Sequence, residues 1–119
     1  MTHAHIPVLD EETISGIREL DGDGEPELLR TLLNMFTSDT PLRIEALQRA
    51  IDNKDLVESA GVAHSLKSGS LGIGAQVLAS VCAGIELYAR QDNLAAAAAL
   101  LPEVSAAYKE ACSQLQRLL

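Results

Sequence analysis

Apolar residues recur along the chain at the three- and four-residue spacing that is typical of α-helices. Asp10 is placed to cap a short first helix that runs to about Leu20. A second helical pattern begins at Glu25 and is interrupted by Pro41, which either kinks this helix or begins a new one. The apolar face on both sides of the proline is predicted to contain Leu28, Leu29, Leu32, Leu33, Phe36, Leu42, Ile44, Leu47 and Ile51.

Two further helices form a predicted hairpin in the middle of the chain. Asp55 is placed to cap the third helix, and Gly72 and Gly74 mark its end and a tight reversal. The fourth helix ends near Gln91. Its apolar stripe is predicted to contain Leu78, Val81, Ile85 and Tyr88.

The last helix begins after a cap at Asp92 or Asn93, and Pro102 is expected to kink it. Its apolar stripe is predicted to contain Val104, Tyr108, Cys112, Leu115 and Leu119. The alternation that is typical of β-strands is absent from the sequence. The patterns together predict an all-α, antiparallel, up-and-down four-helix bundle over residues 10–119, with a short extra N-terminal helix. Residues 1–9 are expected to form a flexible tail.

Composition narrows the class of protein. The 119 residues suffice for one domain, and a net charge of −8 argues against binding to nucleic acid or to an anionic membrane.

Cys82 and Cys112 lie in apolar helical patterns and are expected to be reduced core residues of a cytoplasmic protein. His3 and His5 are assigned to a frayed terminus and not to a metal site. The N-terminal sequence shows no secretory signal, and its Met1 favours a free-standing protein.

One stretch departs from the ordinary pattern of surface charge. Between Ser59 and Ile85 the only formally charged residue is Lys67, whereas 22% of the whole chain is charged. The same stretch contains five of the eight glycines and His64, which is the only histidine outside the tail. A solvated bundle face normally carries charges of both signs. A face of small residues around one histidine and one lysine therefore indicates a surface that another protein covers.

A helical wheel places His64 on the flank of the core, about 100° from the buried position at Ala63. Lys67 follows at i+3, while Gly61 and Ser68 are small neighbours on the same side of the helix. A neutral imidazole is a nucleophile near pH 7, and a nearby ammonium stabilises the negative charge of a phosphoryl group. The chain could therefore accept and donate a phosphoryl group.

The other parts of a kinase are missing from the sequence. It contains no GxxxxGK[ST] loop, no glycine-rich loop followed by a strand lysine, and no acidic cluster near His64 for Mg²⁺. We therefore expect a phosphocarrier without ATP binding or autokinase activity. No cofactor or metal site is expected in this chain, and Mg²⁺ would be bound by the partner.

The stretch AHSLKSGSLGIGA, Ala63 to Ala75, resembles the signature of histidine-containing phosphotransfer (HPt) domains, roughly A-H-x-L-K-G-S-x-x-x-x-G-A. The resemblance extends over nearly the whole chain. It implies that His64 is the phosphoacceptor through Nε2, that Lys67 contacts the phosphoryl oxygens, and that Gly74 lets the two hairpin helices approach closely. It also implies receiver domains of a hybrid sensor kinase and of a response regulator as partners. Small and apolar residues would make the shared docking face, namely Gly61, Ser65, Ser68 and Leu71.

The sequence departs from the HPt pattern at two positions. Ser68 replaces the usual glycine four residues after His64, and it is still small. A glutamine of the facing helix often hydrogen-bonds the imidazole in such domains, and the nearest candidate here is Glu86. In an antiparallel hairpin Cys82 is level with His64, and Glu86 is one turn further along. Glu86 is therefore either an orienting residue that fixes the imidazole tautomer or an ordinary surface charge.

Two rival functions come from other classes. The first is a catalytically silent helical adaptor that binds receiver domains and leaves His64 unused. The second is an enzyme with an imidazole base, such as a hydrolase, but the sequence offers no paired carboxylate or nucleophile near His64. The presence of both His64 and Lys67 favours a phosphorelay intermediate, which is expected to be a cytoplasmic monomer.

Overall fold

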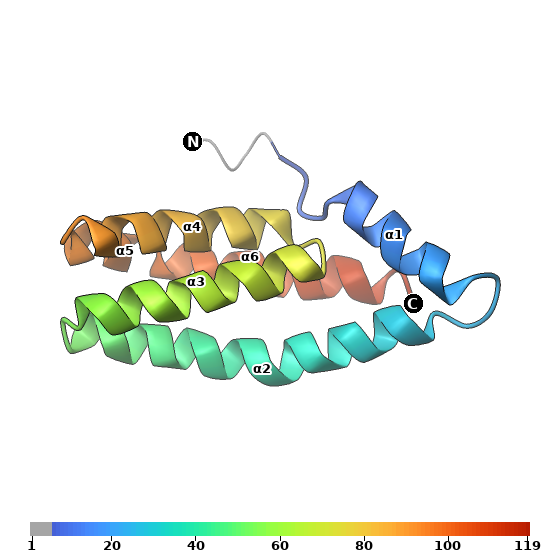
Figure 1. Cartoon of the computed structure of the whole chain (residues 1–119), viewed down its shortest axis with the longest axis horizontal. Helices are drawn as coiled ribbons and strands as arrows, with labels where there is room; N and C mark the ends of the chain where they lie inside the picture. Colours follow the sequence, from blue (N-terminus) through green and yellow to red (C-terminus); the bar gives the residue numbers. More distant parts are fainter. Residues whose placement is uncertain (1–5) are drawn as a thin grey trace.

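The computed structural model describes residues 6–119, which form an elongated bundle with extents of 48 × 28 × 19 Å (Figure 1). From the second helix to the fourth, each helix runs opposite to the one before it, and the last two helices together complete the fourth side of the bundle (Figure 1). The predicted four-helix bundle with a short N-terminal helix is confirmed, and residues 6–119 contain no strand. The helices are α1 (Glu11–Asp21), α2 (Glu27–Asp52), α3 (Leu56–Gly72), α4 (Gln76–Arg90), α5 (Leu94–Ala99) and α6 (Leu101–Gln116).

Polar side chains satisfy the free backbone N–H groups at the helix starts. Asp10 accepts from the N–H of Glu12, Asp55 from that of Glu58, and Asn93 from that of Ala96, so each is the N-cap of its helix. The caps at Asp10 and Asp55 are confirmed, and of the two candidates for the last helix Asn93 is the cap.

The backbone N–H groups at the start of α2 are capped by a side chain from the preceding helix. Asp21, at the end of α1, accepts from the backbone N–H groups of Leu28 and Leu29 at 2.7 and 3.3 Å. This carboxylate therefore joins the end of one helix to the beginning of the next across the exposed turn between them.

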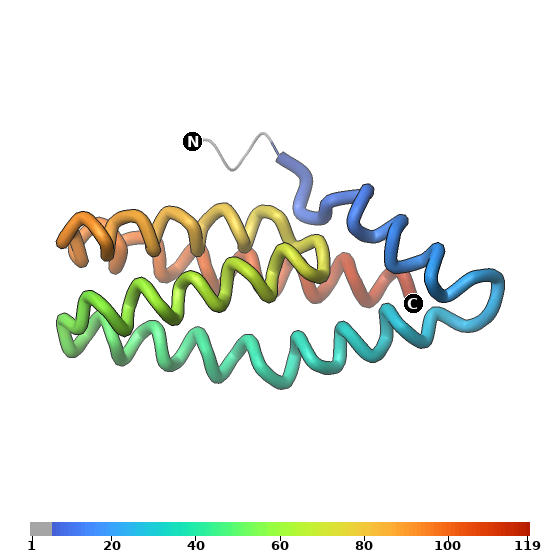
Figure 2. Tube along the Cα trace, in the orientation of Figure 1, coloured from blue at the N-terminus to red at the C-terminus, as the bar shows by residue number. Residues whose placement is uncertain are grey.

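Helix α2 continues through Pro41 as one helix of 26 residues, so no new helix begins at this proline (Figure 2). A proline inside a helix removes one backbone hydrogen bond, so packing on both sides of Pro41 maintains the helix. The prediction that Leu42 belongs to the core face is wrong, because 65% of its surface is exposed. Thr40, one turn after Phe36, takes the buried position instead.

The predicted last helix is divided at Leu100 into α5 and α6. Pro102 lies in the first turn of α6, where its missing N–H costs no helical hydrogen bond. The buried positions of α6 are Val104, Ala107, Ala111 and Leu115. Tyr108 and Cys112 were predicted to be on this stripe but are half-buried at its edge, and Leu119 is exposed. Two small alanines thus let α6 pack closely against its neighbours.

The hairpin between α3 and α4 turns at Gly74, where φ is +80° and glycine is favoured. A Cβ at this position would lie 3.3 Å from Ile14 Cδ1 and 3.4 Å from Asp10 O. The Gly74 carbonyl accepts from the N–H of Asp10 at 2.8 Å. The space that Gly74 leaves is thus filled by the start of α1, so we expect this glycine to serve the attachment of α1 as well as the turn.

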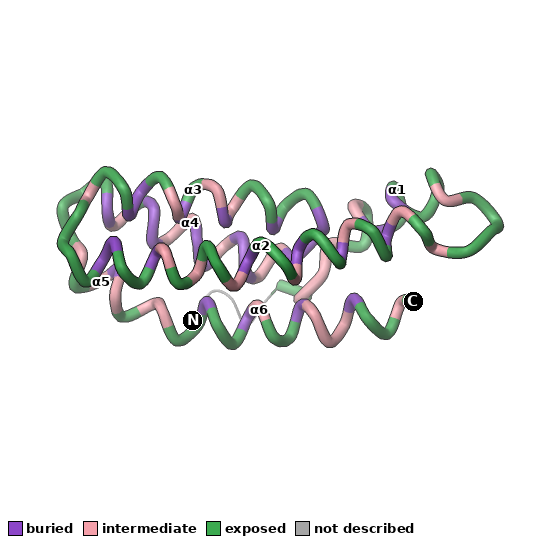
Figure 3. Tube along the Cα trace, turned by 90° about the horizontal axis from the view of Figure 1, so that it is seen from below, coloured by how far each residue is buried: buried purple, intermediate pink, exposed green. Residues whose placement is uncertain are grey.

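Burial follows the inward faces of the helices, while the turn between α1 and α2 is almost entirely exposed (Figure 3). Of the predicted N-terminal tail, residues 1–5 lie outside the described residues, and with them His3 and His5. Val8 and Leu9 pack against the core, and the Gln76 amide donates to the carbonyl of Pro7 at 2.9 Å. No helix within residues 6–119 is long and apolar enough to cross a membrane.

Candidate functional site

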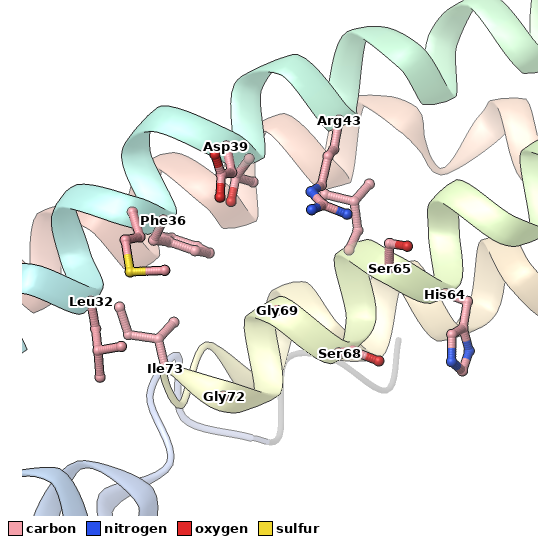
Figure 4. Close-up of a pocket in the computed structure, with 13 residues that line it drawn as sticks. Leu32, Phe36, Asp39, Arg43, His64, Ser65, Ser68, Gly69, Gly72 and Ile73 are labelled. Atoms are coloured by element: carbon pink, nitrogen blue, oxygen red, sulfur yellow. The ribbon is translucent and has the colours of Figure 1, made fainter.

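His64 lies on the outer flank of α3, and its side chain is 55% exposed. Its neighbours Ala63 and Leu66 are buried, with 0% and 2% of their surface exposed. The wheel angle predicted from the sequence therefore describes this helix well. In Figure 4 the His64 ring points away from α2. The imidazole is attached to a rigid helix and remains open to a partner.

Glu86 projects from α4 to the same imidazole. Its Oε2 lies 3.1 Å from His64 Nδ1 and its Oε1 lies 3.3 Å away. The two residues are 22 positions apart, and the antiparallel hairpin brings them together. Only 12% of the Glu86 side chain is exposed, so this carboxylate is largely withdrawn from water.

Two cations neutralise the Glu86 carboxylate. Lys67 Nζ lies 3.2 Å from Oε1, and Arg90 contacts Oε2 through Nη2 at 2.8 Å and through Nε at 3.1 Å. Arg90 follows Glu86 by four residues on α4, and Lys67 follows His64 by three on α3. The four side chains form one network across the two helices.

The contacts of this network keep the Glu86 carboxyl group ionised. Burial by itself would raise the pKa of this carboxyl, but hydrogen bonds from Arg90, Lys67 and His64 outweigh burial and hold the pKa below its usual value of 4.5. Glu86 is therefore a carboxylate at neutral pH, and a carboxylate only accepts hydrogen bonds. His64 Nδ1 must then carry the hydrogen, which leaves the lone pair of a neutral ring on Nε2. Nε2 has no hydrogen-bond partner among residues 6–119.

A groove runs along the other flank of α3, between α3 and α2, with a volume of about 440 Å³ (Figure 4). The α3 side is lined by small residues that leave the space unfilled, including Ser65, Ser68, Gly69 and Gly72. The α2 side is lined by larger residues, including Leu32, Met35, Phe36, Asp39 and Arg43. His64 forms part of the wall, so the groove and the imidazole share one surface.

The four residues predicted to form a docking face lie around His64 in different settings. Ser65 and Ser68 line the groove toward α2. Gly61 lines a separate hollow of about 500 Å³ between α3 and the end of α4, together with Arg90. Leu71 lies two turns after His64 and is 53% exposed. Of these four positions, Gly61, Ser68 and Leu71 are exposed and Ser65 is half-buried.

Sequence reasoning did not find Arg90, Arg43 or Met35. A signal for Arg90 was present, since an acidic residue followed by a basic one at i+4 forms ion pairs on helices. Arg43 and Met35 belong to a helix that is distant in sequence, and only the packing of α2 beside α3 brings them to the groove. No pattern within α2 distinguishes them from its other exposed residues.

Comparison with known proteins identifies the family of this chain. The Hpt domain family matches residues 31–118. Histidine-containing phosphotransfer protein 2 of Arabidopsis thaliana is 25% identical over 109 residues, which cover 89% of this chain and 70% of that protein. Multistep phosphorelay regulator 1 of Schizosaccharomyces pombe is 27% identical over 81 residues, which cover 68% of this chain and 28% of that protein.

Solved structures with the same fold include histidine-containing phosphotransfer protein B of Pseudomonas aeruginosa PAO1. It superimposes with a TM-score of 0.83 at 29% identity and covers 93% of both chains. A histidine-containing phosphotransfer protein of Medicago truncatula shares the fold with a TM-score of 0.79 at 21% identity, covering 92% of this chain and 80% of that one. The chain therefore belongs to the Hpt family of histidine-containing phosphotransfer domains, which are the phosphocarriers of two-component phosphorelays.

Proposed function

We propose that His64 is the phosphoacceptor of this phosphorelay intermediate and that Nε2 is the atom that reacts. The observation that carries the proposal is the contact between His64 Nδ1 and Glu86, because it assigns the hydrogen to Nδ1 and frees Nε2. The 55% exposure of the side chain supports delivery of the phosphoryl group by another protein. A ring this exposed suits delivery by a protein partner better than by a small substrate, which is mostly buried in its pocket.

In the proposed step, the Nε2 lone pair attacks the phosphorus of a partner's aspartyl phosphate. The N–P bond forms as the P–O bond to the aspartate breaks, and the bonding electrons leave with the carboxylate. The hydrogen on Nδ1 stays in its bond to Glu86, so the positive charge that develops on the ring faces a carboxylate. The reverse step passes the group to an aspartate of a second receiver domain. Charge is conserved in both directions.

Lys67 is proposed to stabilise the phosphoryl oxygens. Its ammonium lies 3.2 Å from Glu86 Oε1, and the same oxygen lies 3.3 Å from Nδ1 of the ring. The Lys67 side chain is 30% exposed. A flexible lysine in this place can move toward a new anion, and an ammonium in a partly desolvated site stabilises the equatorial oxygens of a phosphoryl group.

The proposed partners are the receiver domain of a hybrid sensor kinase as donor and that of a response regulator as acceptor. Each would cover the surface around His64 that includes Gly61, Ser65, Ser68 and Leu71. The acidic pocket and its Mg²⁺ would belong to the partner, and this chain would bind neither ATP nor a metal ion. We propose that the protein acts as a cytoplasmic monomer without nucleic-acid or membrane partners.

The test is transfer of labelled phosphate from a phosphorylated receiver domain. We expect the label to move onto this chain in an acid-labile, base-stable linkage, as a phosphohistidine requires, and His64→Gln to abolish it. The rival function, a silent adaptor, predicts receiver binding without label on the wild-type chain. Retained labelling of the His64→Gln variant would show that another residue is the acceptor.

A further inference from the structure

Glu86 is held by two cations that occupy different oxygens. Lys67 Nζ contacts Oε1 at 3.2 Å. Oε2 accepts both hydrogen bonds from Arg90 and is the oxygen closer to His64 Nδ1. The two cations therefore do not compete for one position, and one of them could leave without disturbing the other.

A phosphoryl group on His64 creates a difficulty for this carboxylate. The incoming dianion attracts Lys67, which then no longer balances the charge of Glu86. An unbalanced carboxylate, 12% exposed and in contact with the same imidazole, would repel the phosphoryl group and would tend to turn away from Nδ1. A phosphorylated state with Glu86 still in place thus requires a second counter-ion.

We infer that Arg90 is a positioning residue, which holds the Glu86 carboxylate against His64 Nδ1 while Lys67 moves to the phosphoryl group. The inference rests on the proposed function, since it concerns the same imidazole. Arg90 makes its hydrogen bonds to Glu86 and not to His64, so it acts through Glu86.

The geometry favours Arg90 over Lys67 as the permanent partner. Arg90 directs two N–H donors at a single oxygen from the same helix as Glu86, and a guanidinium loses less freedom per hydrogen bond than an ammonium. Lys67 makes a single contact from the opposite helix. Removal of Lys67 keeps the contacts from Arg90 to Glu86 and from Glu86 to His64. Removal of Arg90 leaves the His64 imidazole as the remaining partner of Oε2.

The test compares Lys67→Met, which imitates departure of the lysine, with Arg90→Gln in the unphosphorylated full chain. The readout is the ¹⁵N spectrum of the His64 ring, which reports the nitrogen that carries the hydrogen. We expect Lys67→Met to keep the hydrogen on Nδ1 and Arg90→Gln to populate both tautomers. Arg90→Lys is expected to restore most of the wild-type signal, and Arg30→Gln, at an exposed arginine of α2, is the matched control.

A kinetic measurement then separates positioning from docking. We expect Arg90→Gln to lower the transfer rate at saturating phosphorylated receiver by about tenfold, with little change in KM. A wild-type ring spectrum in Arg90→Gln, or loss of the Nδ1 hydrogen in Lys67→Met, would overturn the inference. These spectra need no phosphoryl transfer, so failure of the wild-type chain to accept label would contradict only the proposed function.

Discussion

The two flanks of helix α3 beside His64 are built differently. Toward α4, the flank level with the His64 ring is filled by charged side chains, and Glu86 is held there by Lys67 and Arg90. We call this the closed flank; the hollow of about 500 Å³ at Gly61 lies beside it, toward the start of α3. Toward α2, the flank is open and largely apolar, with a groove of about 440 Å³. Arg43 lies at this groove and has no ion-pair partner among residues 6–119. Chemistry at the imidazole requires side chains that are already fixed, whereas docking of a protein requires space that remains free.

Among the variants that test the difference between the two flanks, one that fills the groove is expected to have the largest effect on phosphoryl transfer. Ser68 is exposed on the groove wall, so Ser68→Trp should place a large ring where the partner docks. We expect transfer from a phosphorylated receiver to fall by about a hundredfold, mainly through KM, as for a blocked interface centre. The measurement is single-turnover transfer over a range of receiver concentrations.

The matched control for the groove is Ser105→Trp, at an exposed serine of α6 outside the groove. We expect this variant to transfer like the wild type, and the His64 ring spectrum to be unchanged in both variants. Equal transfer by the Ser68→Trp chain would show that the partner does not use the open flank.

Charge reversal at Arg43 is expected to have the next largest effect. An unpaired guanidinium at the groove is free to meet a carboxylate of the partner, so Arg43→Glu should raise the KM for the receiver by about tenfold at low salt. The transfer rate at saturation should not change, because the closed flank is intact. Titration of the effect with salt is the measurement, and a defect that persists unchanged at high salt would contradict an electrostatic role.

On the closed flank, Glu86→Gln is expected to have a moderate, pH-dependent effect on stability. The pKa of Glu86 is lowered in the folded state, so its stabilising contribution is present above the unfolded value of 4.5 and is lost as the pH falls below it. We expect the variant to be about 1 kcal/mol less stable than the wild type at pH 7. Urea unfolding at a series of pH values should show the stabilities of the two proteins converge as the pH falls below the range in which Glu86 titrates, and a constant difference would contradict the charge network.

The smallest effect on stability and transfer is expected from a methyl group added at Gly61, on the exposed surface of α3. A Cβ at Gly61 would meet no atom within 4 Å, so Gly61→Ala fits the helix without a clash. Replacing a glycine inside a helix should stabilise the fold by about 0.5–1 kcal/mol. Thermal unfolding measures this gain, and transfer kinetics of the same variant show whether a partner approaches the backbone here. A large loss of transfer would support the proposed place of Gly61 in the docking surface, and unchanged transfer would show that the partner leaves room for a methyl group here.

Much of this arrangement follows from local sequence. Asp10 and Asp55 cap their helices through neighbours two or three residues away, and the exposed position of His64 follows from the helical period. The reach of Glu86 followed from the register of an antiparallel hairpin. These features depend on contacts that the sequence spacing itself defines.

Other features depend on packing between distant segments. Helix α2 continues through Pro41, and Leu42 is exposed, because the surrounding bundle outweighs local propensity. The cap that Asp21 provides to α2 spans seven residues and a turn. The groove needs α2 beside the small residues of α3, so neither Met35 nor Arg43 could be selected from the sequence.

The central claim is that His64 reacts through Nε2 while Glu86 keeps the hydrogen on Nδ1. The direct test is the ¹H, ¹⁵N and ³¹P spectrum of the His64 ring before and after transfer from a phosphorylated receiver domain. We expect the phosphoryl group on Nε2 and a retained hydrogen on Nδ1. A phosphoryl group on Nδ1, or on any residue other than His64, would contradict the account.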